Sequence, residues 1–415
     1  MTLPADTGRA VSTGRILLLI AGIYTSQSVI SSIAFLGFPA VLRATGARLD
    51  LVGAVSLLML PWALKFLWAP MVERLRIPPR GQRRSRAIIL PGQALAMLAT
   101  AALALFDPRQ DAVLLFTILA VSACIAASVD IACDGFAVEQ LRPEIRGWGN
   151  VMQIGGGYFG MMVGGSLFLF LMDQTGWLGA CLATAGLLGA LTLPTLFTVE
   201  PDPGTARQDH RPSLQAAWAR PELRWGLLLV VLYQAGVRLA QGMVTPLLID
   251  RGFDLTTIGL LGGILGMAAS LFGTLAAGLA IRKGGVIPVL KACLVLQLAL
   301  ILGFFLVLQI GDLPREVLAG LMIAKFAVMA AGFVTLYTAA MGWSSLKQPG
   351  VDFTLFQCAD AGIAGLAGLT GGILAQHWGY SACFGLAAAL SLFAVLTLPA
   401  LLRVMKADQP YEVLT

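Results

Sequence analysis

Two aspartates, Asp130 and Asp134, lie four residues apart inside an otherwise apolar run at residues 113–139. On a helix, this spacing places both carboxylates on one face. A charged side chain at the middle of a bilayer costs about 2.5–3.5 kcal/mol on insertion scales, so carboxylates retained there are candidates for function. Two like charges this close disfavour joint ionisation, and one carboxyl can then hold a proton near neutral pH. The pair predicts proton coupling or gating. The alternative is that each carboxylate pairs with a cation or a helix end.

A second polar stripe lies in a later apolar run. Gln234, Arg238 and Gln241 recur at i, i+4 and i+7, and Tyr233 lies beside them, so one helical face is polar. The planar guanidinium of Arg238 suits a carboxylate or a phenolate. We expect all four residues to line a substrate site in which Arg238 contacts an anionic group. The alternative is that Arg238 is the buried partner of one of the two aspartates.

Polar residues also repeat at equivalent positions of the two halves of the chain. Adding 207 to the positions of Asn150 and Gln153 gives Gln357 and Asp360. This repeat favours a shared cavity, with Gln153, Gln357 and Asp360 as substrate-binding residues. Lys325 lies in the apolar run that precedes Asp360, so these two residues either contact the substrate or neutralise one another as an intramembrane ion pair.

The first apolar run carries hydroxyl, amide and aromatic groups on a shared face. These residues are Tyr24, Gln27, Ser28, Ser31 and Phe35. Such a face suits an amphipathic ligand, so Tyr24, Gln27, Ser28 and Phe35 are expected to bind substrate. Ordinary hydrogen bonding between packed helices is the alternative.

The composition indicates the class of protein in which these residues are positioned. The chain has 415 residues, of which 58% are hydrophobic and 12% charged, with a mean hydropathy of +0.83. Soluble domains carry about 25% charge, so these values predict a polytopic membrane protein. No histidine accompanies the intramembrane acids, which argues against an enzyme with a nucleophile and a base. The six cysteines lack CxxC spacing and there are only two histidines, so neither disulfides nor a metal site are expected.

Apolar windows long enough to cross a bilayer can be separated at charged or Pro/Gly-rich breaks. Each window reads as an α-helix, because barrel strands would need strict alternation. Twelve windows result: 16–41, 51–71, 87–106, 113–139, 149–172, 178–199, 225–247, 258–280, 286–308, 317–341, 353–376 and 380–402.

The basic residues predict how these windows are oriented. The two tails and the even-numbered loops hold 20 Lys and Arg residues, whereas the opposite side holds five. Under the positive-inside rule, both termini are cytoplasmic. The long polar interruption at residues 200–224 is then a cytoplasmic central loop. It separates a six-helix half at residues 1–199 from a second half at residues 225–415.

Two six-helix halves resemble the major facilitator fold, in which the substrate site lies near the bilayer midplane between the halves. Two motifs carry a narrower resemblance. The run LKFLWAPMVER at residues 64–74 and the run VDIACDG at residues 129–135, which continues to RGWGN at residues 146–150, are similar to motifs of the AmpG-like branch of the major facilitators. Lys65, Asp130 and Asp134 match polar positions of that branch, which implies a coupling or gating role for Lys65 too. Glu73 stands where many facilitators have Asp.

Within that branch, the chain most resembles the RhtX/FptX siderophore permease family. The resemblance implies an inner-membrane secondary transporter that imports a ferric siderophore, ferripyochelin-like, from periplasm to cytoplasm by alternating access and proton symport. The alternative is a permease for muropeptides or another amphipathic metabolite. No cofactor is expected, because iron would enter only as part of the chelated substrate. The expected partners are that small molecule and the lipid bilayer, without nucleic acid, and the expected state is a monomer.

Overall fold

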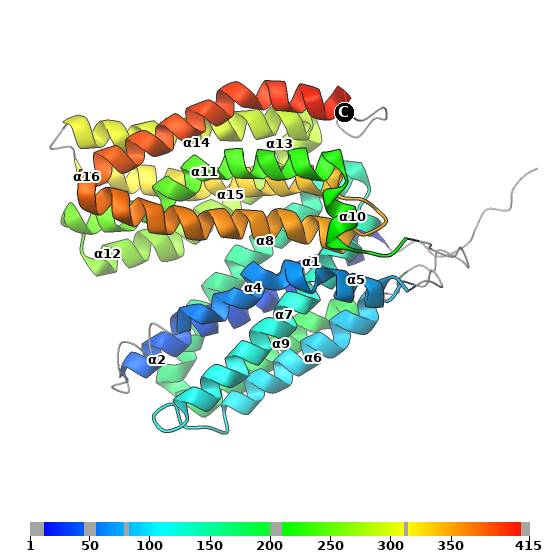
Figure 1. Cartoon of the computed structure of the whole chain (residues 1–415). Helices are drawn as coiled ribbons and strands as arrows, with labels where there is room; N and C mark the ends of the chain where they lie inside the picture. The colour runs from blue at the N-terminus through cyan, green and yellow to red at the C-terminus, as the bar shows by residue number, and fades with distance from the viewer. Residues whose placement is uncertain are drawn as a thin grey trace, which may run out of the picture. The chain divides into compact units, whose positions relative to one another are not determined.

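The computed structural model describes residues 12–44, 55–78, 83–198, 200, 210–310 and 314–407, and within these ranges the chain forms helices and no strands (Figure 1). The α-helices are α1 (Thr13–Ser32), α2 (Phe38–Ala44), α4 (Leu60–Leu64), α5 (Ala69–Arg76), α6 (Ser85–Leu103), α7 (Ala112–Gln140), α8 (Arg146–Met162), α9 (Phe168–Leu196), α10 (Leu214–Trp218), α11 (Pro221–Asp250), α12 (Leu255–Leu260), α13 (Gly266–Gly284), α14 (Val286–Ile310), α15 (Arg315–Trp343) and α16 (Pro349–Ala407).

Short turns of other helix types join some of these α-helices. Wider π-helical turns connect α1 to α2, α8 to α9 and α12 to α13; they are Ile33–Gly37, Val163–Leu167 and Leu261–Leu265. Tighter 3₁₀ turns occur at Val55–Met59, Lys65–Leu67 and Pro143–Ile145. One apolar segment long enough to cross a membrane, Thr257–Gly284, runs through α12, a π-helical turn and α13.

Nine helical segments of the described residues are long and apolar enough to cross a membrane. Two of them, within α9 and α16, contain one glycine with a left-handed backbone: φ is 72° at Gly176 and 78° at Gly379. These glycines lie in the expected breaks between windows 149–172 and 178–199 and between windows 353–376 and 380–402. The predicted all-helical membrane fold is therefore confirmed.

The second expected window, 51–71, has the least regular backbone. Its described part runs through a 3₁₀ turn, α4, a second 3₁₀ turn and α5. Pro61 and Pro70 lie in the first turns of α4 and α5, where a missing backbone N–H is tolerated. The second 3₁₀ turn, between the two helices, begins at Lys65.

The chain forms two compact units. The first falls within Met1–Leu141, Val163–Leu214 and Ser345–Thr354, and the second within Arg142–Met162, Gln215–Ser344 and Leu355–Thr415. The division into halves at residues 1–199 and 225–415, with a loop at residues 200–224, stays a prediction. In the first unit, α1, α6, α7 and α9 surround a core of aliphatic and aromatic side chains that includes Val29, Phe38, Leu115, Phe168 and Leu188.

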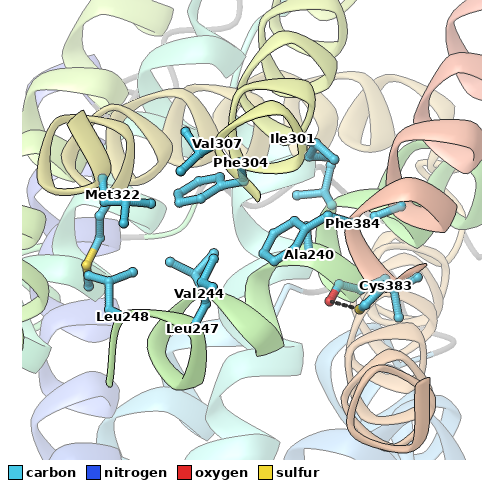
Figure 2. Packing of buried hydrophobic residues seen from close by; sticks show 14 of the residues in the cluster. Ala240, Val244, Leu247, Leu248, Ile301, Phe304, Val307, Met322, Cys383 and Phe384 are labelled. Atoms are coloured by element: carbon cyan, nitrogen blue, oxygen red, sulfur yellow. Dashed lines mark hydrogen bonds between the residues drawn. The ribbon is translucent and has the colours of Figure 1, made fainter. Parts of the chain in front are cut away.

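The second unit is built around α11, α13, α14, α15 and α16, and α8 packs on α13 and α15 (Figure 1). Figure 2 shows its core, where Phe304 of α14 and Phe384 of α16 stack with ring centroids 5.5 Å apart, and Val244 of α11 lies in the same cluster. Gly273 allows α13 to approach α15 closely, because a Cβ at this position would lie 2.0 Å from the Ala327 carbonyl oxygen.

Candidate functional site

The first unit brings a buried cation to the predicted aspartate pair. The Lys65 ammonium forms an ion pair with Asp130, and it lies 3.7 Å from Oδ2 of Asp134. The Tyr24 hydroxyl donates a hydrogen bond to Asp134. The side chains of Lys65, Asp130 and Asp134 are 3%, 7% and 0% exposed. The first, second and fourth expected spans therefore converge on one charged cluster.

Local structure accounts for this convergence. In α7, Asp130 and Asp134 are one helical turn apart, so both reach the same side. The 3₁₀ turn at Lys65 is held near α7 by a hydrogen bond from Trp68 Nε1 to Ser128 Oγ, 3.1 Å long. One ammonium thus lies within reach of two carboxylates. In such an arrangement, one carboxylate can take up a proton while the other keeps the ion pair with the ammonium.

The other expected residues of α1 lie near this cluster in sequence but have varied surroundings. Gln27 is buried and Ser28 is half-buried, while the Ser31 hydroxyl donates to the Gln27 carbonyl oxygen at 2.9 Å. The Phe35 ring meets Trp62 edge to face, with centroids 6.3 Å apart. In the first unit, α1 packs on α7 and α9 (Figure 1). The Ser31 bond lies within one helix, so it does not test the hydrogen bonding between packed helices that was the alternative for this face.

The second unit contains a separate charged cluster on α11, α15 and α16. Arg238 forms a two-pronged ion pair with Asp360, with Nε to Oδ1 at 3.0 Å and Nη2 to Oδ2 at 2.5 Å. Tyr337 donates to Asp360 Oδ2 at 3.0 Å, and Arg238 Nη1 donates to Gln241 Oε1 at 3.2 Å. The guanidinium also lies 4.7 Å from the Phe333 ring centroid. The Arg238–Asp360 pair is therefore nearly neutral, and the Phe333 ring forms an aromatic wall beside it.

Two expected pairings are corrected by this geometry. Asp360 pairs with Arg238 and not with Lys325, whose ammonium lies 4.6 Å from the Phe326 ring centroid. Arg238 likewise has Asp360 as its carboxylate partner, whereas the expected alternative was one of the two aspartates of α7. Both errors have one cause: sequence shows which helices carry charges but not how far each helix is rotated about its axis.

Of the remaining expected residues, Tyr233, Gln234 and Gln153 are buried and Gln357 is half-buried. The structure adds Gln297 of α14, which sequence reasoning missed. A Cβ at Gly332 would lie 2.3 Å from Gln297 Nε2 and 3.0 Å from the Tyr233 hydroxyl, so these polar groups meet where α15 has no side chain.

Gln297 also lines a small cavity of about 20 Å³ together with Gln241 and Lys325. A cavity of this volume can hold about one water molecule. A single glutamine in an apolar run gives only a weak sequence signal, because its function depends on what lies opposite.

A buried ion network in the first unit was also missed. Arg76 pairs with Glu73 at 2.8 Å and with Glu139 at 2.6 Å, and Arg83 reaches Glu139 at 3.1 Å. Glu139, near the end of α7, thus bridges Arg76 and Arg83. Glu73 also accepts a hydrogen bond from the Gly350 backbone N–H at 3.1 Å.

Arg76 is fully buried in this network. Burial alone lowers its pKa, but the carboxylates of Glu73 and Glu139 raise the pKa above its ordinary value. The guanidinium therefore stays charged and fixes both acids. The i, i+3 spacing of Glu73 and Arg76 was the available sequence signal.

Comparison with known proteins shows the family to which the chain belongs. The profile of the Major Facilitator Superfamily matches residues 16–341. The chain is 32% identical over 271 residues to the anhydromuropeptide permease of Escherichia coli (strain K12). The aligned region covers 64% of this chain and 55% of that protein. The chain is also 23% identical over 393 residues to the putative transporter AmpG 3 of Rickettsia prowazekii (strain Madrid E), covering 89% of this chain and 90% of that protein.

Solved structures agree on the fold. The human organic anion transporter MFSD10 (TETRAN) superposes with a TM-score of 0.74 at 16% identity, covering 93% of this chain and 99% of the other. At this identity the likeness bears on the fold alone. The apolar helices agree with a multi-pass membrane protein, and the family profile shows that the chain belongs to the Major Facilitator Superfamily.

Proposed function

We propose that this protein is a proton-coupled permease of the bacterial inner membrane that imports an anhydromuropeptide-type cargo from periplasm to cytoplasm by alternating access. The single observation that carries the cargo class is the 32% identity to an anhydromuropeptide permease over 271 residues. The aligned part is only 55% of that relative's length, so activity and cargo are both part of the proposal. Both termini are cytoplasmic in this proposal, as the distribution of basic residues predicts.

The proton site is the cluster of Lys65, Asp130 and Asp134. Two buried carboxylates compete for one ammonium, and protonation of one removes a negative charge from the membrane interior. A reversible change of this kind can bias which state of the carrier is populated. The Tyr24 hydroxyl donates a hydrogen bond to Asp134, so the two carboxylates of the cluster have different neighbours.

The cargo site includes the cluster around Arg238. A muropeptide carries hydroxyls and peptide carboxylates, and a carboxylate of the cargo can compete with Asp360 for the guanidinium fork. Tyr337 and Gln241 already bond to this pair and supply further hydrogen-bonding groups. Displacement leaves the Asp360 carboxylate with the Tyr337 hydroxyl as its donor, so the site gains one negative charge unless a proton is taken up with the cargo.

A ferric siderophore is the second candidate cargo. The observation that favours it is the aromatic wall of the same cluster, where Phe333 lies over Arg238 and 6.0 Å from Tyr337 between ring centroids. A compact aromatic chelate with a carboxylate would fit such a wall, and the chelator would fill the coordination sphere of the iron. The comparisons with named relatives favour the muropeptide.

The test is uptake of both cargoes by proteoliposomes that contain the full chain. We expect concentrative uptake of a radiolabelled anhydromuropeptide and none of radio-iron carried by ferripyochelin or by a panel of other siderophores. Uptake of a ferric siderophore alone would replace the proposed cargo with the second candidate. Uptake of neither would reject both.

Arg238 provides the matching binding test on purified protein. Arg238→Ala should weaken binding of the transported cargo about ten- to hundredfold, which is the value of one hydrogen bond to a charged group. Arg238→Lys should restore part of it, because the ammonium keeps the charge but loses the fork. Arg403→Ala removes an exposed arginine at the end of α16 and is the matched control. Unchanged affinity in Arg238→Ala would remove this residue from the cargo site.

A further inference from the structure

The second unit contains a large cavity that the transport clusters do not use. Its volume is about 680 Å³, and the ends of α8, α13 and α15, the first residues of α14 and the 3₁₀ turn before α8 surround it. Cavities of about 300–1,000 Å³ are the size that binds small molecules. The basic-residue distribution assigns the two loops at this cavity, 140–148 and 281–287, to the cytoplasmic side.

The charge of the cavity is positive. Arg146 and Arg282 both line it, and Glu144 is the one acid among its lining residues. Within the described part of the chain, neither arginine forms an ion pair at 4.0 Å or less. Arg282 is exposed and free to move, whereas Arg146 is half-buried.

Arg146 carries the strongest signal for a ligand. Its Nε atom is buried and has no hydrogen-bond partner among the described residues. Leaving a buried donor unpaired costs free energy, and more for a charged group, so such groups are nearly always paired with protein or water. Nε of Arg146 therefore has room in its hydrogen bonding for an acceptor, which a molecule in the cavity can supply.

The walls indicate the rest of the ligand. Trp148, Ile281, Val286 and Ile287 supply aromatic and aliphatic surface beside the two arginines. Thr338 of α15 also lines the cavity and falls near the end of the expected span 317–341. A ligand that fits both parts has an anionic head and an apolar or glycerol-like body.

We propose that this cavity is a binding site for a phosphate group, held by Arg146 and Arg282. Phosphate offers three acceptor oxygens to two planar guanidinium forks, a better match than one carboxylate. Two sources share this chemistry: the headgroup of an anionic phospholipid in the cytoplasmic leaflet, and a soluble phosphate ester. Basic pockets between transmembrane helices on the cytoplasmic side are suited to the first.

The experiment compares two double variants of the full chain. Arg146→Ala with Arg282→Ala removes both cavity arginines. The control, Arg142→Ala with Lys283→Ala, removes two exposed basic residues from the same two loops and changes the net charge equally, but neither residue lines the cavity. Nε of Arg146 has no hydrogen-bond partner among the described residues, so Arg146→Ala breaks no internal hydrogen bond from this atom.

Two probes separate the two sources. Phosphatidylglycerol is titrated into protein held in phosphatidylcholine nanodiscs, and the lipid molecules bound to each protein are counted by native mass spectrometry. Binding of glycerol 3-phosphate is measured by titration calorimetry. We expect at least one probe to bind, the cavity variant to bind it about a hundredfold more weakly, and the control to lose less than about threefold. Binding of the lipid alone assigns a headgroup, and binding of the ester assigns a soluble ligand.

Glu144→Gln keeps the proposal falsifiable if the alanine variants fold poorly. It removes the one acid that lines the cavity, so it should tighten binding of whichever probe binds. Equal affinity in the cavity and control variants would overturn the proposal. So would the failure of both probes to bind the unmodified protein.

Discussion

Lys65 is the residue on which the stability of the first charged cluster depends most. It neutralises charge on two buried aspartates, so its removal leaves carboxylates without their ammonium. Breaking a buried ion pair on one side costs about 3–5 kcal/mol, whereas replacing both partners costs much less. We therefore predict that Lys65→Met lowers the thermal unfolding midpoint strongly and that adding Asp130→Asn recovers part of the loss.

The control for this cycle is Lys291→Met, the same substitution at an exposed lysine of α14. It should change the free energy of unfolding by less than about 0.5 kcal/mol. If Lys65→Met and Lys291→Met unfold at the same temperature, the ammonium does not stabilise the aspartates.

At this scale, sequence predicted some contacts and missed others. The i, i+4 spacing of Asp130 and Asp134 was enough to place both on one side of α7, because helix geometry alone decides it. The role of Lys65 came only through resemblance to a family, although a charged side chain within the window 51–71 was itself an available signal. The Arg238–Asp360 pair joins residues 122 positions apart. Such a pair depends on the rotation of two helices, which no local pattern specifies.

The transmembrane helices themselves were predictable because hydropathy and length determine where a chain can cross a bilayer. The glycine breaks in α9 and α16 coincided with the ends of the expected windows. The π-helical turns were not predicted, because a π turn depends on one extra residue inside an otherwise helical pattern. The irregular second window was expected as one span, although Pro61 and Pro70 were available signals.

The break at Gly379 gives a prediction about a single element. A Cβ there would touch nothing within 4 Å, so the whole cost of Gly379→Ala is backbone strain at φ 78°. Because ψ is 169°, this backbone conformation is essentially restricted to glycine, and we expect the substitution to cost about 1–3 kcal/mol in the free energy of unfolding. Gly372→Ala in the same helix also meets nothing within 4 Å, but its φ is not left-handed.

Gly372→Ala should therefore be neutral or stabilise by about 0.5–1 kcal/mol. Thermal unfolding in one detergent measures both variants. Equal effects of the two substitutions would show that Gly379 does not need a left-handed backbone, and that α16 is continuous.

For the whole molecule, the predicted orientation rests on the 20-to-5 distribution of basic residues between the two sides. Reporter fusions after Arg86 and Arg211 should report a cytoplasmic location, and a fusion at Arg109 a periplasmic one. Alkaline phosphatase and green fluorescent protein give opposite signals and check each other. A cytoplasmic signal at Arg109 would contradict the twelve-span topology.

The central claim is that the aspartate pair couples cargo movement to protons, and transport by Asp130→Asn and Asp134→Asn in proteoliposomes tests it most directly. Asparagine keeps the size and hydrogen bonding of each side chain but cannot titrate. Asp173→Asn, at an exposed aspartate of α9, is the matched control. Two activities are measured for each variant: accumulation driven by a pH gradient, and exchange of labelled for unlabelled cargo.

We predict that at least one of the two variants loses accumulation and keeps exchange, because exchange needs a loaded carrier that reorients but no driving proton. The control should keep both activities. If both variants still concentrate cargo under a pH gradient, the proton does not bind this pair and the account is contradicted. Loss of accumulation and exchange together, with a lower unfolding temperature, would equally contradict it, because the aspartates would then serve only to hold the fold.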